Sequence, residues 1–166
     1  MSTLEDSTTF SRPVSLVLAI IPVVAAGVLG NLATIPNIPT WYASLVKPAF
    51  NPPNWIFGPV WTALYVLMAY AFYRILCQTP GHKWRRAAIV AFLVQIALNA
   101  AWSFAFFGAH SAALGLAVIL PLWVAIAVTM WLFWLQDSVA GGCIAPYLAW
   151  VSFAVLLNVA IWRLNG

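Results

Sequence analysis

The sequence predicts an all-α fold, a bundle of five transmembrane helices with an ordered proline-rich loop between the first and second helices. Hydrophobic residues make up 64% of the 166 residues and charged residues only 6%, and the mean hydropathy is +0.97. Such a chain has too little polar surface for a soluble domain of this size. Its apolar runs are about 20 residues long, enough to cross roughly 30 Å of hydrocarbon as helices. They do not alternate polar with apolar residues, which disfavours a transmembrane β-barrel.

Each apolar run is expected to form one membrane-spanning helix. The five runs cover residues 14–34, 55–76, 87–108, 112–135 and 144–163. Residues 1–13 are then an N-terminal tail, and residues 14–166 form a single transmembrane domain. The tail carries two acids, Glu5 and Asp6, and only one base, Arg12. A cleaved secretory signal would have a basic leader, so we do not expect one here.

The segment between the first two runs reads WYASLVKPAFNPPNWIFGPVWTALY, residues 41–65. Proline fixes φ and removes a backbone donor, so Pro48, Pro52 and Pro53 cannot lie in a lipid-facing helix. We therefore expect a stiff, apolar loop that is ordered at the membrane surface and covers something beneath it.

The basic residues are distributed unequally over the two predicted sides. One side holds Arg12, Arg74, Lys83, Arg85 and Arg86, and the other holds Lys47 and Arg163. Lysine and arginine in short loops tend to stay cytoplasmic, so a bacterial inner membrane would place the N-terminus inside and the proline-rich loop outside. The basic cluster at residues 82–86 suits anionic lipid headgroups. It is too small to indicate nucleic-acid binding.

Ionisable residues are absent from the middle of every predicted span. Ion pumps and proton relays depend on such groups, so a coupled transporter is disfavoured. His82 and His110 stand in loops without neighbouring ligands, which argues against a metal site. The acids Glu5, Asp6 and Asp137 lie in the tail and a loop, so no catalytic triad can be assembled. No catalytic residue and no required cofactor is expected.

Polar and aromatic residues recur along one face of the third span. They are Gln95, Asn99, Trp102, Ser103 and Phe106, at intervals of three or four. A buried amide without a partner costs roughly 1–3 kcal/mol, so Gln95 and Asn99 should face another helix or a cavity. Two interpretations stay open: these residues line a ligand site, or they form hydrogen bonds between helices.

Two other spans carry aromatic rows. Trp150, Ala154, Asn158 and Trp162 are spaced by four in the fifth span, and Trp61 and Tyr65 are one turn apart in the second. Three helices thus offer aromatic faces with a few hydrogen-bonding groups, which is typical of a pocket for a flat, largely apolar ligand. The alternative is that aromatic residues fill the core or form interfacial belts, and we expect a belt position for Trp41, Trp84 and Trp162.

Small residues form a ridge on the third span, at Ala97, Ala101 and Ala105. Such a ridge lets two helices approach closely in a membrane. It can pack against a neighbouring helix or against a second protomer, and we expect a homodimer.

Three motifs in order resemble the translocator protein family (TspO/MBR), the tryptophan-rich sensory proteins that include the peripheral benzodiazepine receptor. They are residues 41–65 given above, NAAWSFAFFG at residues 99–108, and PYLAWVSFAVLLNVAIWRLN at residues 146–165. The likeness covers nearly the whole chain after the first dozen residues. It implies a five-helix bundle, commonly dimeric, with a porphyrin-binding and drug-binding cavity closed by the loop between the first two helices.

The resemblance also implies which residues line the cavity. Carried over position by position, they are Tyr42, Pro52, Phe57, Trp61, Tyr65, Asn99, Trp102, Ser103, Trp150 and Ala154. Trp61 and Trp150 match two indoles linked in bacterial relatives to light-dependent breakdown of protoporphyrin. Asn99 and Tyr65 would orient the ligand, and Lys47 would meet a porphyrin propionate.

The resemblance therefore implies a membrane receptor or sensor for protoporphyrin, haem or similar flat apolar molecules. The alternatives are a transporter of porphyrins or lipids, a light-dependent porphyrin-degrading protein, and a purely structural membrane protein. The chain departs from animal members at the carboxy-terminal cholesterol motif, because the stretch around Arg163 has no tyrosine. It also lacks a long basic tail, which fits a bacterial member better.

Overall fold

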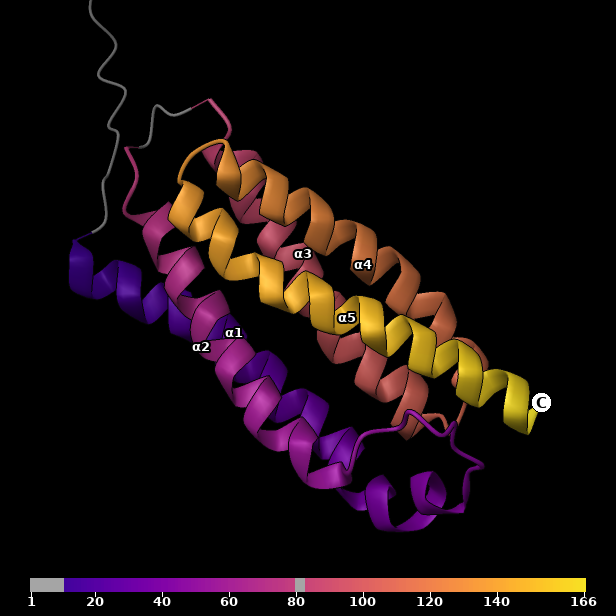
Figure 1. Ribbon diagram of the computed structural model, residues 1–166. Coiled ribbons are helices and arrows are strands. Elements are labelled where there is room, and N and C mark those ends of the chain that lie inside the picture. Colours follow the sequence, from indigo (N-terminus) through magenta and orange to yellow (C-terminus); the bar gives the residue numbers. More distant parts are fainter. Residues whose placement is uncertain (1–10, 80–82) are drawn as a thin grey trace, which may run out of the picture.

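The computed structural model describes residues 11–79 and 83–166. Within these ranges it contains five long helices and no strand, which confirms the predicted all-α class. The helices are α1 (Arg12–Thr34), α2 (Asn54–Leu76), α3 (Arg85–Ser103), α4 (Ala112–Trp134) and α5 (Ser138–Asn165). They form an elongated bundle in which the loop after α1 lies at the same end as the C-terminus (Figure 1). Our expectations for Glu5, Asp6 and His82 fall outside the described residues.

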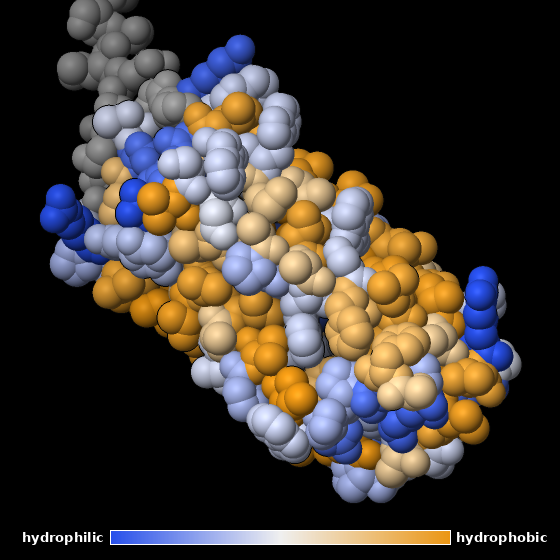
Figure 2. Space-filling view, in the orientation of Figure 1, coloured by the Kyte–Doolittle hydropathy of each residue, from blue (hydrophilic) through white to orange (hydrophobic). Residues whose placement is uncertain are grey.

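The five helices are each long and apolar enough to cross a membrane. The most hydrophilic residues gather at the two ends of the bundle, and the surface between them is mainly apolar (Figure 2). An apolar band flanked by polar ends matches the profile of a bilayer. The chain is a multi-pass membrane protein.

The first span does not stop at residue 34 but continues through two irregular turns. These are the 3-10 turn η1 (Ile35–Asn37) and the π-helical turn η2 (Ile38–Tyr42). Pro36 and Pro39 lack an N–H group, so regular α-helical hydrogen bonding cannot continue past them. The side chain of Asn37 donates from Nδ2 to the carbonyl of Ala33 at 2.8 Å, which satisfies a backbone acceptor in this stretch. The motif at residues 41–65 therefore begins within η2, the last turn of this extension of α1.

The fifth helix begins at Ser138, earlier than the hydropathy pattern predicted. Asp137 causes the early start, because its Oδ1 accepts hydrogen bonds from the N–H groups of Val139 (2.9 Å) and Ala140 (3.1 Å). An aspartate at this position satisfies backbone donors that a helix N-terminus leaves free. The other carboxylate oxygen accepts from Arg74 Nε at 2.7 Å. Asp137 therefore links the end of α2 to the start of α5.

This link should make stability depend on pH in the acid range. Burial alone would raise the pKa of Asp137, but the hydrogen bond from Arg74 and those from the Ala140 and Val139 N–H groups together lower it below its usual 3.8. The stabilisation is therefore complete above the unfolded pKa and is lost as pH falls through the lower, folded pKa. Between about pH 4 and pH 2, the melting temperature in detergent should fall further for the wild type than for Asp137→Asn. Equal falls in both proteins would contradict this assignment.

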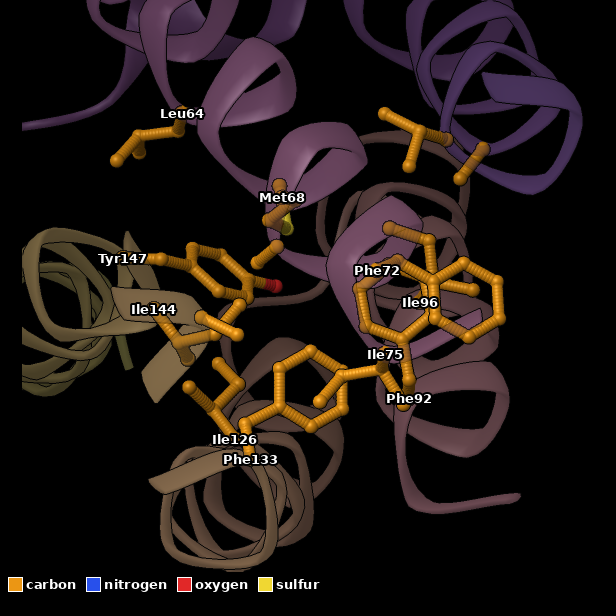
Figure 3. Packing of buried hydrophobic residues seen from close by; sticks show 14 of the residues in the cluster. Leu64, Met68, Phe72, Ile75, Phe92, Ile96, Ile126, Phe133, Ile144 and Tyr147 are labelled. Carbon is orange, nitrogen blue, oxygen red and sulfur yellow. The ribbon is translucent and has the colours of Figure 1, made fainter. Parts of the chain in front are cut away.

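The apolar core occupies the half of the bundle near the turn between α4 and α5. It is built from buried residues of the second half of α2, the first half of α5 and the facing parts of α1, α3 and α4. Figure 3 shows side chains from several helices pointing into it. Phe92 stacks on Phe72 with ring centroids 4.1 Å apart, and on Phe133 at 5.8 Å. A second, smaller cluster of buried residues, including Phe106, Phe107 and Ile161, lies towards the opposite end.

The proline-rich loop, residues 43–53, is tied to the end of α5. Asn165 accepts from the N–H of Val46 through Oδ1 at 2.9 Å and donates from Nδ2 to the Val46 carbonyl at 3.0 Å. Tyr42 donates from its hydroxyl to Asn51 Oδ1 at 2.9 Å. One amide side chain thus satisfies both backbone groups of Val46. We call this pair of hydrogen bonds the Val46–Asn165 clamp.

Candidate ligand-binding cavity

A cavity of about 490 Å³ lies between the core and the proline-rich loop. Residues of α1, α2, α3 and α5 form its walls, and the turns η2 and η3 (Phe104–Gly108) close its loop end. Among the described residues that line it, there is no aspartate, glutamate, lysine, arginine or histidine. The volume falls in the range of small-molecule sites, and the apolar lining is typical of them.

Aromatic rings from α2 and α5 form one wall. Phe57, Trp61 and Tyr65 follow one another at intervals of one turn on α2, and the Trp61 and Tyr65 ring centroids are 5.5 Å apart. Phe57 meets Trp150 of α5 edge to face at 5.9 Å. Edge-to-face and tilted contacts of this kind are the favoured geometries of aromatic pairs. The rings of this wall therefore pack against one another.

A hydrogen-bonded chain of three side chains forms the polar deep end of the cavity. Tyr65 donates from its hydroxyl to Asn99 Oδ1 at 3.3 Å, and Asn99 Nδ2 donates to the hydroxyl oxygen of Tyr147 at 2.8 Å. Tyr147 is fully buried, whereas Asn99 and Tyr65 line the cavity. Asn99 thus joins α2, α3 and α5 and still presents a polar surface to the cavity. In this arrangement the Asn99 amide forms hydrogen bonds between helices and also lines the cavity, so the two interpretations do not exclude each other.

A second polar group lies where α3 faces α5. Trp102 donates from Nε1 to Asn158 Oδ1 at 3.2 Å, and Asn158 Nδ2 donates to the Ala112 carbonyl at 2.7 Å. The Trp102 ring stacks on Phe106 with centroids 5.3 Å apart. These bonds satisfy the indole N–H and the amide, so Trp102 offers mainly its apolar surface to a ligand.

Nine of the ten predicted site residues line this one cavity. They are Tyr42, Phe57, Trp61, Tyr65, Asn99, Trp102, Ser103, Trp150 and Ala154. Pro52 does not line the cavity, and Lys47 does not line it either. The Lys47 ammonium group lies 4.7 Å from the centre of the Tyr42 ring and donates a hydrogen bond to the Leu45 carbonyl. The roof is instead Tyr42 of η2, a buried ring that packs on Phe107 at 5.6 Å. Gln95 is buried in α3 and does not reach the cavity.

The wall that α1 contributes was missed by the sequence prediction. Gly27, Gly30, Asn31 and Thr34 all line the cavity. A Cβ on Gly27 would lie 3.2 Å from Tyr65 Cε2, and one on Gly30 would lie 3.0 Å from Ser103 Oγ. Glycine therefore allows α1 to approach α2 and α3 closely. The sequence feature that could have indicated this wall is the pair Gly27 and Gly30, which are three residues apart and therefore lie on one face of the helix.

The fold and the cavity together define a class of protein, a five-span α-helical membrane protein that encloses an uncharged aromatic pocket. Comparison with known sequences gives the family. The TspO/MBR family model matches residues 18–163, which is most of the chain, and the chain belongs to this family. This confirms the resemblance that the three sequence motifs indicated.

Curated relatives come from bacteria, archaea and animals. The chain is 40% identical to the tryptophan-rich protein TspO of Chlorobaculum tepidum over 85% of this chain and 89% of the relative. It is 37% identical to protein CrtK of Rhodobacter capsulatus, over 91% and 94% of the two chains. It is 36% identical to the human translocator protein, over 75% of each chain. The similarity therefore extends over the helices that build the cavity.

Proposed function

We propose that this protein is a membrane receptor or sensor that binds porphyrins, such as protoporphyrin or haem, and similar flat apolar molecules in its cavity. The observation that carries the proposal is the uncharged cavity with Phe57, Trp61 and Trp150 on its wall. Burial of ring surface would supply about 25 cal/mol per Å². Offset or edge-to-face stacking would add roughly 0.5–1.5 kcal/mol per contact. A relative in Cereibacter sphaeroides is named tryptophan-rich sensory protein, which fits a sensing role.

The polarity of the lining sets the orientation of such a ligand. Asn99 and Tyr65 offer hydrogen bonds at the deep end, while the charged propionates of a porphyrin would find no counter-charge inside. A buried carboxylate without a partner is strongly unfavourable. The ring edge would therefore point inward, and the propionates would stay at the exposed edge of the cavity near Asn54, the first residue of α2. The porphyrin is a ligand in this proposal and not a cofactor required for folding.

Replacing both Trp61 and Trp150 by leucine tests the proposed site. Loss of two stacking contacts removes about 1–3 kcal/mol, so the Kd for protoporphyrin should rise roughly 5-fold to 150-fold. Titration followed by the absorption band of the porphyrin avoids any change in the reporter when indoles are removed. The matched control is the pair Trp131→Leu and Trp162→Leu, because both indoles are exposed on the outside of the bundle. Unchanged affinity in the Trp61 and Trp150 variant would overturn the proposed pocket.

Light-dependent porphyrin breakdown is a second candidate function, and one observation favours it. Both Trp61 and Trp150 line the same cavity, so two electron-rich indoles would lie next to a bound photosensitiser. Multiple turnovers without modification of the protein would identify an enzyme. A porphyrin or lipid transporter would instead show vectorial flux into proteoliposomes.

A homodimer is part of the proposal. Ala97 and Ala101 are exposed on α3, where a second copy can approach the helix closely.

A further inference from the structure

The contact between α1 and α2 stops partway along the cavity. The two helices run antiparallel and meet where Gly27 faces the ring of Tyr65. One turn nearer the loop, Asn31 of α1 and both Thr62 and Gly58 of α2 line the cavity and are also exposed. Apart from the chain neighbours of Gly58 and the nearby backbone of α2 itself, no heavy atom of the described residues lies within 4 Å of the position that a Cβ on Gly58 would take. The seam between the helices is therefore open at this level.

The part of the cavity beneath the Tyr42 roof is closed by comparison. Tyr42 is buried and packs on Phe107, and no residue of the loop 43–53 lines the cavity. The Val46–Asn165 clamp holds that loop against α5 through two hydrogen bonds. A molecule leaving through this end would have to displace the Tyr42 ring and the turn that carries it.

The open seam faces the apolar part of the surface. The exposed apolar side chains near it are Leu32 of α1, Ile35 of η1 and Trp55 of α2. The hydroxyl of Thr62 donates to the Gly58 carbonyl at 2.9 Å, and Asn31, Gly58 and Thr62 carry no charge. A surface of this kind suits an uncharged molecule dissolved in the bilayer.

We propose that ligands exchange between the cavity and the bilayer through the seam at Asn31, Gly58 and Thr62, and not through the loop end. Ligands that use this route are uncharged or carry their charged groups at one edge. The portion of the ligand that moves through the seam contacts hydrocarbon, where a charge is strongly unfavourable. The proposal depends on the cavity and its opening, and not on which molecule fills the cavity.

A bulky side chain at Gly58 tests the route. Gly58→Phe would place an aromatic ring in the open seam, starting from a Cβ position that has no atom of a neighbouring helix within 4 Å in the described structure. The matched control is Gly142→Phe on α5, a second exposed helical glycine whose Cβ position is also free of atoms within 4 Å in the described structure. Thr62→Phe is a second blocking variant, and Asn165→Ala breaks the clamp at the loop end.

The reporter is a thiol inside the cavity, introduced as Ala154→Cys in a protein with Cys77→Ser and Cys143→Ser. The protein is placed in phosphatidylcholine vesicles, and the rate of alkylation by pyrenyl maleimide dissolved in the bilayer is measured. Gly58→Phe and Thr62→Phe should slow the reaction roughly tenfold or more, equivalent to a barrier about 1.4 kcal/mol higher. Gly142→Phe and Asn165→Ala should leave the rate unchanged.

Three results would overturn the route. The first is an unchanged rate in both blocking variants, and the second is a large acceleration in Asn165→Ala, which would place the exchange at the loop. The third is a thiol that the bilayer reagent never reaches in the unblocked protein. The alkylation experiment uses no porphyrin. The protoporphyrin titration therefore tests the proposed function, and the alkylation rate tests the exchange route independently of it.

Discussion

Replacing Gly141 by alanine is expected to destabilise the protein by about 1–3 kcal/mol, because the added methyl group has no room. A Cβ at Gly141 would lie 2.8 Å from Cε3 of Trp134 and 2.9 Å from the Trp134 Cα. The second of these atoms is backbone, so rotation of a side chain cannot relieve the overlap. The start of α5 would have to move away from the end of α4. Thermal unfolding in detergent, followed by circular dichroism, measures the loss.

The adjacent residue provides the control. Gly142 is exposed, and the position of its Cβ is free of heavy atoms within 4 Å in the described structure. Alanine is favoured over glycine inside a helix by roughly 0.5–1 kcal/mol, so Gly142→Ala should be neutral or stabilising. Equal melting temperatures for the two variants would show that the close approach of α5 to Trp134 does not limit stability.

Replacing Ala154 by phenylalanine should abolish most ligand binding, with the Kd for protoporphyrin rising about a hundredfold or more, or roughly 2.8 kcal/mol. Ala154 lines the cavity one turn after Trp150, so the larger ring would occupy space that the ligand needs. The cavity can accept the new ring, and the melting temperature of the unliganded protein should change little. Titration and thermal unfolding of the same preparation separate the two effects.

The matched control is Ala149→Phe, which adds the same ring on the exposed face of α5. This variant should bind with wild-type affinity. If Ala154→Phe also binds normally, the ligand does not occupy this cavity, even though nine predicted residues surround it.

The helices could be predicted from the sequence because the bilayer imposes a simple rule. A segment that crosses hydrocarbon has to be apolar and has to satisfy its own backbone, so hydropathy alone located all five spans. The ends of the helices were less predictable. Asp137 starts α5 early, and Pro36 and Pro39 convert the end of α1 into irregular turns instead of ending it. Capping and local hydrogen bonding decide these boundaries, and hydropathy does not report them.

The candidate site was partly predictable for a related reason. Residues three or four apart share a helix face, so the spacing of Trp61 with Tyr65, and of Trp150 with Ala154, placed each pair on one side of its helix. Which faces meet was not visible in the spacing. The family resemblance supplied that grouping, and the structure places these residues around one cavity.

By itself, therefore, the sequence determined that this chain crosses the membrane five times and which helix faces carry aromatic and amide groups. Both are properties of single segments, set by local composition and helical period. The tertiary structure alone decided that Tyr42 and not Pro52 roofs the cavity, that glycines bring α1 into its wall, and that the seam at Gly58 stays open. These features depend on how closely two helices approach, and that distance is set by contacts between residues far apart in the chain.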